Sequence, residues 1–183
     1  MEPSASKHRI AVVLVAAGRG ERAGASEGPK QYRSIGGHAV IAHTLDAFLD
    51  HPAIAAISIA THPDDAALFA EAIGELPRHV MTVPGGATRQ ASTLLALRSL
   101  KPFDPDIVLI HDAVRPFADR NLIDRVIEKA TSGVGALPAL AVSDTLKRGE
   151  PHGRVSGTVD RTGLFAAQTP QGFTFEAILN AHE

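Results

Sequence analysis

The 183-residue chain contains no cysteine, which excludes disulfides, thiolate metal sites and a cysteine nucleophile. It also lacks any apolar run that approaches the roughly 18 residues of a membrane span. The polar opening, residues 1–9, has no apolar segment of the kind found in a secretory signal. We therefore expect a cytoplasmic protein that has no membrane partner.

The chain also has no large excess of positive or negative charge. The chain has 18 Lys and Arg against 20 Asp and Glu, a net charge of −2, so nothing indicates a bulk attraction to nucleic acid. The 9 histidines are scattered without metal-ligand spacing. Neither a Gly-x-Ser-x-Gly elbow nor a Gly-Lys-Ser/Thr phosphate loop occurs, which argues against a serine hydrolase and a P-loop kinase. An anionic ligand must then be held by local cations.

What the chain does have is an alternation of apolar runs with helical periodicity, typical of an α/β architecture with a mostly parallel sheet. Its length fits one domain. In the helix expected at 89–100, Leu94, Leu95 and Leu97 are available for the core. The expected strands cover residues 10–15, 55–60, 80–83 and 107–110. The expected helices cover residues 40–49, 64–76, 89–100, 121–130 and 175–181.

After Gly133 the pattern changes. Residues 144–148 and 154–159 are polar, β-capable segments on either side of Gly149-Glu150-Pro151-His152-Gly153, which predicts a β-hairpin with a loose loop. The hairpin offers little apolar surface on either face. A two-stranded arm of this kind is not stable by itself, so we expect it to pack on another subunit.

The strand expected at 10–15 leads into the loop Ala16-Ala17-Gly18-Arg19-Gly20-Glu21-Arg22, which is followed by Gly28-Pro29-Lys30-Gln31. Glycines let backbone N–H groups approach a phosphate closely, and cations offset its charge. With three cations (Arg19, Arg22 and Lys30), the loop suits a triphosphate whose α-phosphorus reacts. A solvated surface turn is the alternative.

The same loop, as Gly18-x-Gly20-x-x-Ala23, matches a loose dinucleotide-binding fingerprint. Two features disfavour that interpretation and an NAD-type oxidoreductase with it. Gly24, Gly28 and Pro29 interrupt the helix that should begin under a pyrophosphate. No acidic residue ends a second strand about 20 residues further on, where a ribose would need it.

A second group, His111-Asp112-Ala113-Val114-Arg115-Pro116, follows the strand expected at 107–110. Ligands in open α/β sheets bind at the carboxyl ends of the strands. A lone Asp112 there can bind Mg²⁺ or a ribose hydroxyl, because hard cations prefer oxygen. The alternative is that Asp112 caps a helix or pairs with Arg115.

Two further segments carry weaker signals. In Gly85-Gly86-Ala87-Thr88-Arg89-Gln90-Ala91-Ser92 the glycines expose backbone groups, and Ser92 lies early on the next helix. Such a segment can read a base edge, and a plain strand-to-helix turn is the alternative. In the arm, Thr145 and Arg161 on paired strands could clamp a phosphate, with Arg161 as a bidentate donor. An exposed polar hairpin is the alternative there.

Together these segments resemble the 2-C-methyl-D-erythritol 4-phosphate cytidylyltransferases of the non-mevalonate isoprenoid pathway. The family's order and spacing are kept over about residues 10–175. Many nucleotidyltransferases share the first loop, whereas the His-Asp-Ala, Asp-Thr-x-Lys and Val-Asp-Arg elements together are more specific. The matching segments are Ala16-Ala17-Gly18-x-Gly20-x-Arg22, Pro29-Lys30-Gln31-Tyr32, Gly85-Gly86-x-x-Arg89-x-x-Ser92, His111-Asp112-Ala113-x-Arg115-Pro116, Asp144-Thr145-x-Lys147, Thr158-Val159-Asp160-Arg161 and Gln168-Thr169-Pro170-Gln171.

The resemblance implies a three-layer, Rossmann-like nucleotidyltransferase fold with a protruding hairpin arm for dimerisation. It also implies a reaction, in which a cytidylyl group passes from CTP to 2-C-methyl-D-erythritol 4-phosphate with Mg²⁺ as cofactor. The substrate phosphate attacks the α-phosphorus in line, giving 4-diphosphocytidyl-2-C-methyl-D-erythritol and pyrophosphate. No covalent enzyme intermediate is needed, and catalysis is mostly positioning and charge stabilisation.

The resemblance also implies roles for single residues. Arg22 and Lys30 would stabilise the charge that develops on the phosphate oxygens. Asp112 would lie at the metal or the ribose. The nucleotide would be held by Ala16, Ala17, Gly18, Gly86, Ala87, Ser92, Asp112 and Ala113. The acceptor would be bound by Arg115, Thr145, Arg161 and Thr169, of which Thr145 and Arg161 come from the arm of the partner subunit.

Residues 1–183 would then form one nucleotidyltransferase domain of a homodimer, with its arm at about residues 140–160. Family members usually continue with a further acidic residue near the metal and a lysine near the phosphates, so we expect this C-terminal segment of the family to be missing here. Some relatives are fused to a downstream cyclodiphosphate synthase domain, which leaves such a fusion open. Two alternatives also stay open: a cytidylyltransferase for a pentitol phosphate such as ribitol 5-phosphate, and a non-catalytic nucleotide-binding module.

Overall fold

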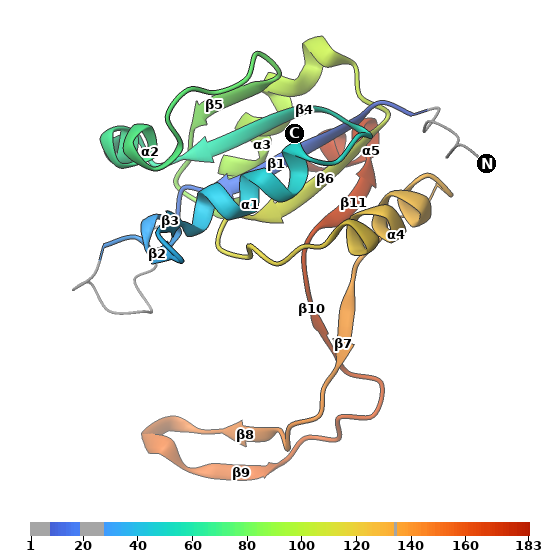
Figure 1. The fold of residues 1–183 in the computed structure, drawn as a ribbon. Helices are drawn as coiled ribbons and strands as arrows, with labels where there is room; N and C mark the ends of the chain where they lie inside the picture. The colour runs from blue at the N-terminus through green and yellow to red at the C-terminus, as the bar shows by residue number, and fades with distance from the viewer. Residues whose placement is uncertain (1–7, 19–27, 134) are drawn as a thin grey trace.

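A five-stranded sheet organises the body of the molecule (Figure 1), as the computed structural model shows for residues 8–18, 28–133 and 135–183. Its strands are β1 (Ile10–Ala16), β4 (Ile54–Thr61), β5 (Val80–Pro84), β6 (Ile107–Asp112) and β11 (Gln171–Thr174). Across the sheet they run in the order β11, β6, β1, β4, β5. The strands β6, β1, β4 and β5 are parallel, and β11 is antiparallel to β6. The mostly parallel α/β fold expected from the sequence is confirmed.

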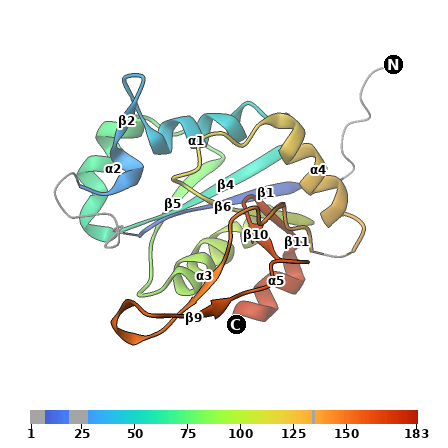
Figure 2. The same cartoon turned by 90° about the horizontal axis from the view of Figure 1, so that it is seen from below.

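Helices cover both faces of this sheet, which explains why its strands are almost continuously apolar. The helices are α1 (Val40–Leu49), α2 (Ala66–Ile73), α3 (Arg89–Leu100), α4 (Arg120–Ala130) and α5 (Phe175–His182). Figure 2 shows α1, α2 and α4 on one face and α3 and α5 on the other. Side chains of β1 point alternately to the two faces: Ile10, Val12 and Leu14 join the first core, and Ala11 and Val13 join the second.

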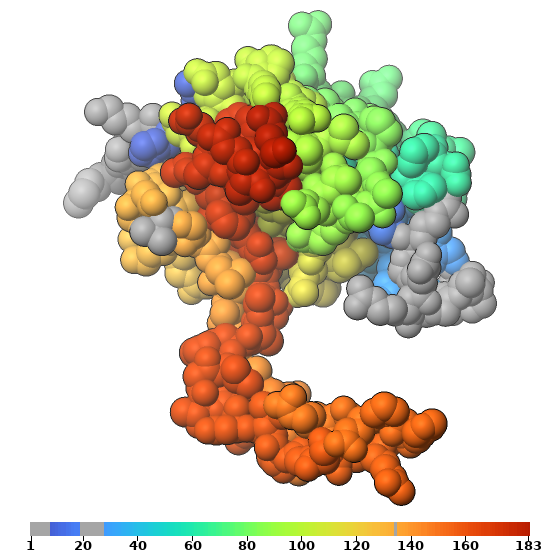
Figure 3. All heavy atoms as spheres, turned by 180° about the vertical axis from the view of Figure 1, so that it is seen from behind, coloured from blue at the N-terminus to red at the C-terminus, as the bar shows by residue number. Residues whose placement is uncertain are grey.

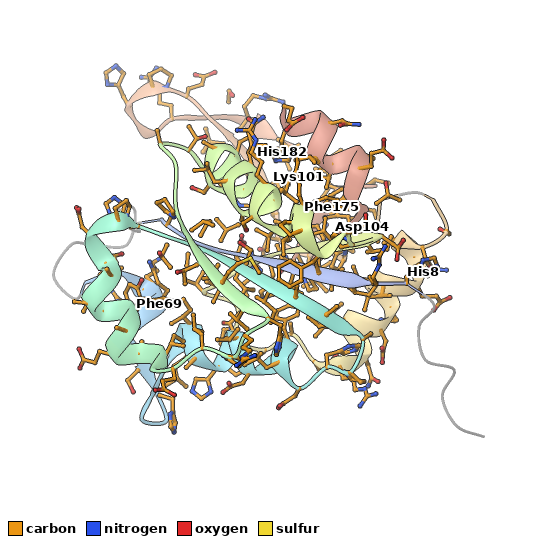
Figure 4. The ribbon with its side chains drawn as sticks, turned by 90° about the horizontal axis from the view of Figure 1, so that it is seen from above. His8, Phe69, Lys101, Asp104, Phe175 and His182 are labelled. Carbon is orange, nitrogen blue, oxygen red and sulfur yellow. The ribbon has the colours of Figure 1, made fainter. Side chains whose placement is uncertain are left out.

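The aromatic side chains follow the same division. Phe69 of α2 and Phe175 of α5 lie on opposite sides of the sheet (Figure 4) and belong to the two separate cores. Phe48 of α1 is fully buried in the first core. Burial of one such side chain contributes about 1.5–3 kcal/mol. Two apolar layers therefore fix the positions of the strand ends.

The helices confirm most of the sequence predictions, with two differences. Helix α3 has the predicted bounds, and Thr88 caps it by accepting a 3.0 Å hydrogen bond from the backbone N of Ala91. The prediction that Leu95 is available for the core is wrong, since Leu95 is 37% exposed and lies off the buried stripe that contains Leu97 and Leu100. Helix α2 is shorter than predicted, because it begins after the 3-10 turn η4 (Pro63–Asp65) and ends at Gly74 with φ 70°.

An arm leaves the body after α4 and returns before β11 (Figures 1 and 3). Its root is the antiparallel pair β7 (Ala139–Ala141) and β10 (Phe165–Ala167), and its tip is the antiparallel pair β8 (Lys147–Gly149) and β9 (Val155–Thr158). All residues of these four strands are exposed. The antiparallel pairing of β8 with β9 is consistent with the predicted hairpin, whereas its packing on another subunit stays a prediction.

Short elements complete the described chain. The two-residue strands β2 (Ser34–Ile35) and β3 (His38–Ala39) form a small hairpin before α1. Three further 3-10 turns are η3 (Lys30–Tyr32), η5 (Lys101–Phe103) and η6 (Pro151–Gly153). In the parts of the chain that the structure describes, no helix is long and apolar enough to cross a membrane.

Candidate active site

The topology of the sheet creates a crevice between β1 and β6. From β1 the chain proceeds to β4 and β5 on one side and then crosses to β6 on the other side, and ligands of open α/β sheets bind where the strand order reverses in this way. Val15 and Asp112 are paired neighbours at the carboxyl ends of these two strands. A cavity of about 580 Å³ opens there.

Most residues predicted to hold the nucleotide lie together in this cavity, which we call the nucleotide cavity. Its lining includes Ala16, Ala17, Gly18, Lys30, Gly86, Ala87, Ser92 and Asp112. Ala113 is not among them, because it is fully buried behind the wall and its carbonyl accepts a 2.9 Å hydrogen bond from Oγ1 of Thr44. Arg22 lies outside the described residues.

The residues predicted to bind the acceptor are divided between two places. Arg115 and Thr169 line a neighbouring cavity of about 650 Å³, which shares Val114 with the nucleotide cavity. Thr145 and Arg161 lie on the arm and line neither cavity, and the prediction that they lie on paired strands is wrong, because both lie outside β8 and β9. Arg161 donates a hydrogen bond to the carbonyl of Ser143, within the arm itself. The chain therefore brings neither Thr145 nor Arg161 of its own arm to its own cavities.

Gly85 lets the third predicted segment approach the first, and Gly86 lets that segment pack against the start of α3. A Cβ atom on Gly85 would lie 2.2 Å from Cβ of Ala17, and one on Gly86 would lie 2.6 Å from Cβ of Ala91, so neither position accepts a side chain without movement. The buried Ser92 hydroxyl accepts a 3.1 Å hydrogen bond from the backbone N of Gly86 and donates one of 2.9 Å to the carbonyl of Thr88. Its hydrogen bonds thus shape the loop that forms the cavity wall.

Gln31 closes the base of the first loop. Its side chain is 2% exposed, and its Nε2 donates hydrogen bonds of 2.7 Å to the carbonyl of Ala16 and 3.2 Å to that of Gly18. Because Gln31 follows Lys30 directly in η3, these bonds tie the cationic side of the cavity to the end of β1. The sequence placed Gln31 in a motif but gave it no role.

Asp112 is held by two arginines. Its Oδ1 accepts a 2.8 Å hydrogen bond from Nη2 of Arg89, and its Oδ2 accepts one of 3.2 Å from Nε of Arg115. Burial opposes the charge, but the hydrogen bonds and charges of Arg89 and Arg115 outweigh it and lower the pKa of Asp112 below its ordinary value. The carboxylate is therefore ionised at neutral pH. Pairing with Arg115 is the alternative weighed above, and Arg89 is the partner that sequence reasoning missed.

The other alternative, a helix cap, is excluded for Asp112. The cap of α4 is Asp119, whose Oδ1 accepts a 2.7 Å hydrogen bond from the backbone N of Leu122. Asp112 instead ends β6, with its side chain in the nucleotide cavity. Its position is set by the strand, and its orientation by the two arginines.

His111 supports the loop from inside the core. Its ring is fully buried, lies 5.0 Å from that of Phe48 and places Nε2 2.9 Å from the carbonyl of Arg115. Burial lowers the pKa of His111 to about 4, although the Arg115 carbonyl and the Asp112 charge act in the opposite direction. The ring is thus neutral at pH 7. Because Nδ1 has no hydrogen-bond partner among the described residues, we assign the proton to Nε2, which donates to the carbonyl of Arg115.

The donor set of the cavity suits a metal that arrives with phosphates. Within residues 8–18, 28–133 and 135–183 no cluster of three metal-binding side chains occurs, and Asp112 is the one carboxylate in the described lining of the nucleotide cavity. Mg²⁺ commonly binds through one or two carboxylates together with substrate phosphates and water. Asp112 fits that use, and the described side chains alone form no cage for the ion.

Comparison with known proteins agrees with this geometry. The family model of 2-C-methyl-D-erythritol 4-phosphate cytidylyltransferase, IspD, matches residues 10–183. The chain belongs to the IspD family. The resemblance and the nucleotidyltransferase fold expected from the sequence are confirmed.

Solved structures of the family share the fold. The crystal structure of a 4-diphosphocytidyl-2C-methyl-D-erythritol synthase is 32% identical, with a TM-score of 0.80 over 96% of this chain and 80% of that one. The 2-C-methyl-D-erythritol 4-phosphate cytidylyltransferase of Thermus thermophilus is 34% identical, with a TM-score of 0.71 over 95% of this chain and 74% of that one.

Longer relatives of the IspD family are more similar in sequence. The bifunctional enzyme IspD/IspF of Chelativorans sp. (strain BNC1) is 56% identical over 183 residues, which are 100% of this chain and 45% of that protein. The enzyme of the same name from Mesorhizobium japonicum is 57% identical over 95% of this chain and 43% of that protein. The chain thus spans less than half the length of these bifunctional relatives.

Proposed function

We propose that this chain transfers a cytidylyl group from CTP to 2-C-methyl-D-erythritol 4-phosphate, releasing pyrophosphate. The observation that carries the proposal is the nucleotide cavity, which Lys30 and the ionised Asp112 line together with Ala16–Gly18 after β1 and with Gly86 and Ala87 before α3. Family membership supports the choice of substrates.

In this proposal the chain positions its two substrates and stabilises the charge that develops on the phosphate, and it forms no covalent bond to either substrate. Lys30 and Arg22 would stabilise the negative charge that builds on the α-phosphate oxygens during in-line attack. Asp112 would hold Mg²⁺, which supplies charge neutralisation of the phosphates when it is bound. Since Arg89 and Arg115 already occupy both carboxylate oxygens, they keep Asp112 charged and oriented before any ligand arrives.

The acceptor would lie beside Arg115 and Thr169, with Thr145 and Arg161 supplied by the arm of a second copy. Two observations support a homodimer. The arm strands have no buried residue of their own. Large apolar side chains at the arm root and beside it are exposed, namely Phe117 at 85%, Leu137 at 56%, Leu140 at 64% and Phe165 at 63%. A partner subunit would remove this surface from water.

The rest of the proposal concerns organisation. Residues 1–183 would form one nucleotidyltransferase domain, and the bifunctional relatives support its fusion to a second enzyme, which the resemblance leaves open as a cyclodiphosphate synthase. The cytoplasmic location expected from the sequence stays a prediction.

The test is turnover of the full-length protein with CTP, Mg²⁺ and each acceptor, measured as pyrophosphate release. We expect release with 2-C-methyl-D-erythritol 4-phosphate and none when the acceptor is omitted. Release with ribitol 5-phosphate alone would contradict the acceptor. Binding of CTP without turnover on either acceptor would show a non-catalytic nucleotide-binding module.

A further inference from the structure

Arg115 is held at two edges of its guanidinium. Its Nε donates to Oδ2 of Asp112 at 3.2 Å, and its Nη1 donates to Oε1 of Gln168 at 2.5 Å. Gln168 lies between β10 and β11, where the arm rejoins the body. The two contacts come from different segments at the rim of the neighbouring cavity: one from the end of β6, the other from the arm root.

Gln168 is itself fixed in place. Its backbone N donates a 2.8 Å hydrogen bond to the carbonyl of Pro138, which precedes β7, and its side-chain Nε2 donates one of 3.2 Å to the carbonyl of Ala166. The second bond determines which way the amide faces, since Nε2 must point to a carbonyl and Oε1 to the guanidinium. The glutamine therefore presents an oriented acceptor to Arg115.

A second contact joins the same two segments. The backbone N of Asp112 donates a 3.4 Å hydrogen bond to Oγ1 of the buried Thr169. Residues 168 and 169 thus contact both ends of the turn from Asp112 to Arg115. From α3 to the arm root, the side chains of Arg89, Asp112, Arg115 and Gln168 form one continuous series of hydrogen bonds.

We propose that Gln168 is a positioning residue for the cytidylyl transfer, because it holds Arg115 in the orientation that serves the acceptor and ties this orientation to the root of the arm. The inference rests on the proposed function. Arginine has a long side chain with many rotamers, and Asp112 alone fixes one edge of it. Without Gln168 the Arg115 guanidinium is free to turn about its contact with Asp112. The acceptor phosphate would then bind a less ordered guanidinium, and its binding would be weaker.

The kinetic test uses Gln168→Leu, Gln168→Glu and, as a matched control, Gln171→Leu in the full-length protein. Gln171 is the neighbouring glutamine, whose side chain contacts the Gln168 carbonyl at 3.4 Å and not Arg115. We expect Gln168→Leu to raise the KM for the acceptor about tenfold, the size of one lost charge-assisted hydrogen bond, with the KM for CTP unchanged. Gln168→Glu keeps an oxygen acceptor and should restore most of the loss, and Gln171→Leu should not change the acceptor KM.

Two further readouts separate this inference from the proposed function. In an Arg115→Ala background, Gln168→Leu should have no additional effect on the acceptor KM, because the two residues act through one contact. The Nη–H signals of Arg115 in an NMR spectrum, assigned by their loss in Arg115→Lys, should exchange faster with water in Gln168→Leu than in the control, with or without turnover, because Nη1 loses its acceptor. Additive effects, or unchanged Nη–H signals, would overturn the inference; absence of turnover in the wild type would overturn only the proposed function.

Discussion

Nη2 of Arg89 lies 2.8 Å from Oδ1 of Asp112, so the first residue of α3 is bonded to the last residue of β6. This pair connects two walls of the nucleotide cavity that are 23 positions apart in the chain. Arg98, on the same helix, pairs instead with Glu183 at 3.5 Å and lies in the described lining of neither cavity. Both arginines pair with a carboxylate, but only Arg89 lines the nucleotide cavity. Substitution of Arg98 is therefore a matched control for substitution of Arg89.

Arg89→Ala should weaken the use of CTP. It leaves one oxygen of Asp112 without its hydrogen-bond donor, and the loss of one such charge-assisted bond corresponds to about a tenfold rise in the KM for CTP. Steady-state kinetics against CTP concentration measures this change. Arg98→Ala should leave the KM within the error of the wild type. Equal effects of the two substitutions would remove Arg89 from the site.

Lys30→Ala should act mainly on turnover. Loss of a charge-stabilising donor costs on the order of 3 kcal/mol of transition-state stabilisation, about 100-fold in kcat. Lys101→Ala is the control, since Lys101 pairs with Glu183 at 3.3 Å and is not in the described lining of the cavity. A fall in kcat of tenfold or less, with Lys101→Ala unchanged, would contradict the role assigned to Lys30.

Gln31→Leu should affect both stability and nucleotide binding. The substitution keeps the approximate size of the side chain but leaves the Ala16 carbonyl without its 2.7 Å hydrogen bond, a loss of about 1–3 kcal/mol for a buried acceptor. Urea unfolding measures the stability, and calorimetry measures the affinity for CTP. If both stay at wild-type values, Gln31 does not shape the cavity.

Alkaline titration reads the surroundings of Tyr32 directly, because the chain has 1 tyrosine and no tryptophan. Burial raises the pKa of Tyr32 to about 12, and the Asp65 carboxylate adds to the effect. The unfolded chain loses this proton near pH 10. Between roughly pH 10 and 12 it therefore binds fewer protons than the folded chain, and this contribution to stability is lost as the pH rises.

We expect the tyrosinate absorbance to appear near pH 12 in the folded chain and near pH 10 in concentrated urea. Over the same interval Tyr32→Phe should lose less stability than the wild type. If the tyrosinate absorbance reaches its midpoint at pH 10 while circular dichroism shows that the chain is still folded, the pKa of Tyr32 is not raised and the prediction is wrong.

A mixture of two defective variants tests whether the arm works across subunits. Lys30→Ala removes the lysine that lines the cavity, and Arg161→Ala removes the arginine of the arm that is proposed to bind the acceptor. In a mixed dimer one site combines an intact cavity with an intact arm, so co-expression should restore about a quarter of wild-type activity by random pairing within a twofold dimer. The variants measured alone are the controls. No recovery, with mixed dimers isolated, would show that each arm does not serve the other subunit.

Long regular segments could be predicted from the sequence, because each has a pattern of its own. The buried strands appear as apolar runs, and α3 has the bounds expected from the sequence. The resemblance to the family named most of the described residues that line the nucleotide cavity, and the glycines and cations after the first strand indicate phosphate binding. The strands β7, β10 and β11 were missed because they are three or four residues long and depend on distant partners.

The contacts that organise the site were not predicted for the same physical reason. Arg89 and Asp112 are 23 positions apart, and Arg115 and Gln168 are 53 positions apart. No local sequence pattern can therefore predict either pair. Gln31 is polar and lies in a short turn, where the sequence gives no sign that it is buried. Such pairings follow from the fold of the whole domain rather than from any segment.

A crystal structure of the full-length protein with CTP and Mg²⁺ tests the central claim most directly. We expect the triphosphate in the cavity between Ala16–Gly18 and the Gly85–Gly86 turn, with Lys30 at the α-phosphate and the carboxylate of Asp112 facing the metal or the ribose. A nucleotide bound elsewhere, with Lys30 directed into solvent, would contradict it.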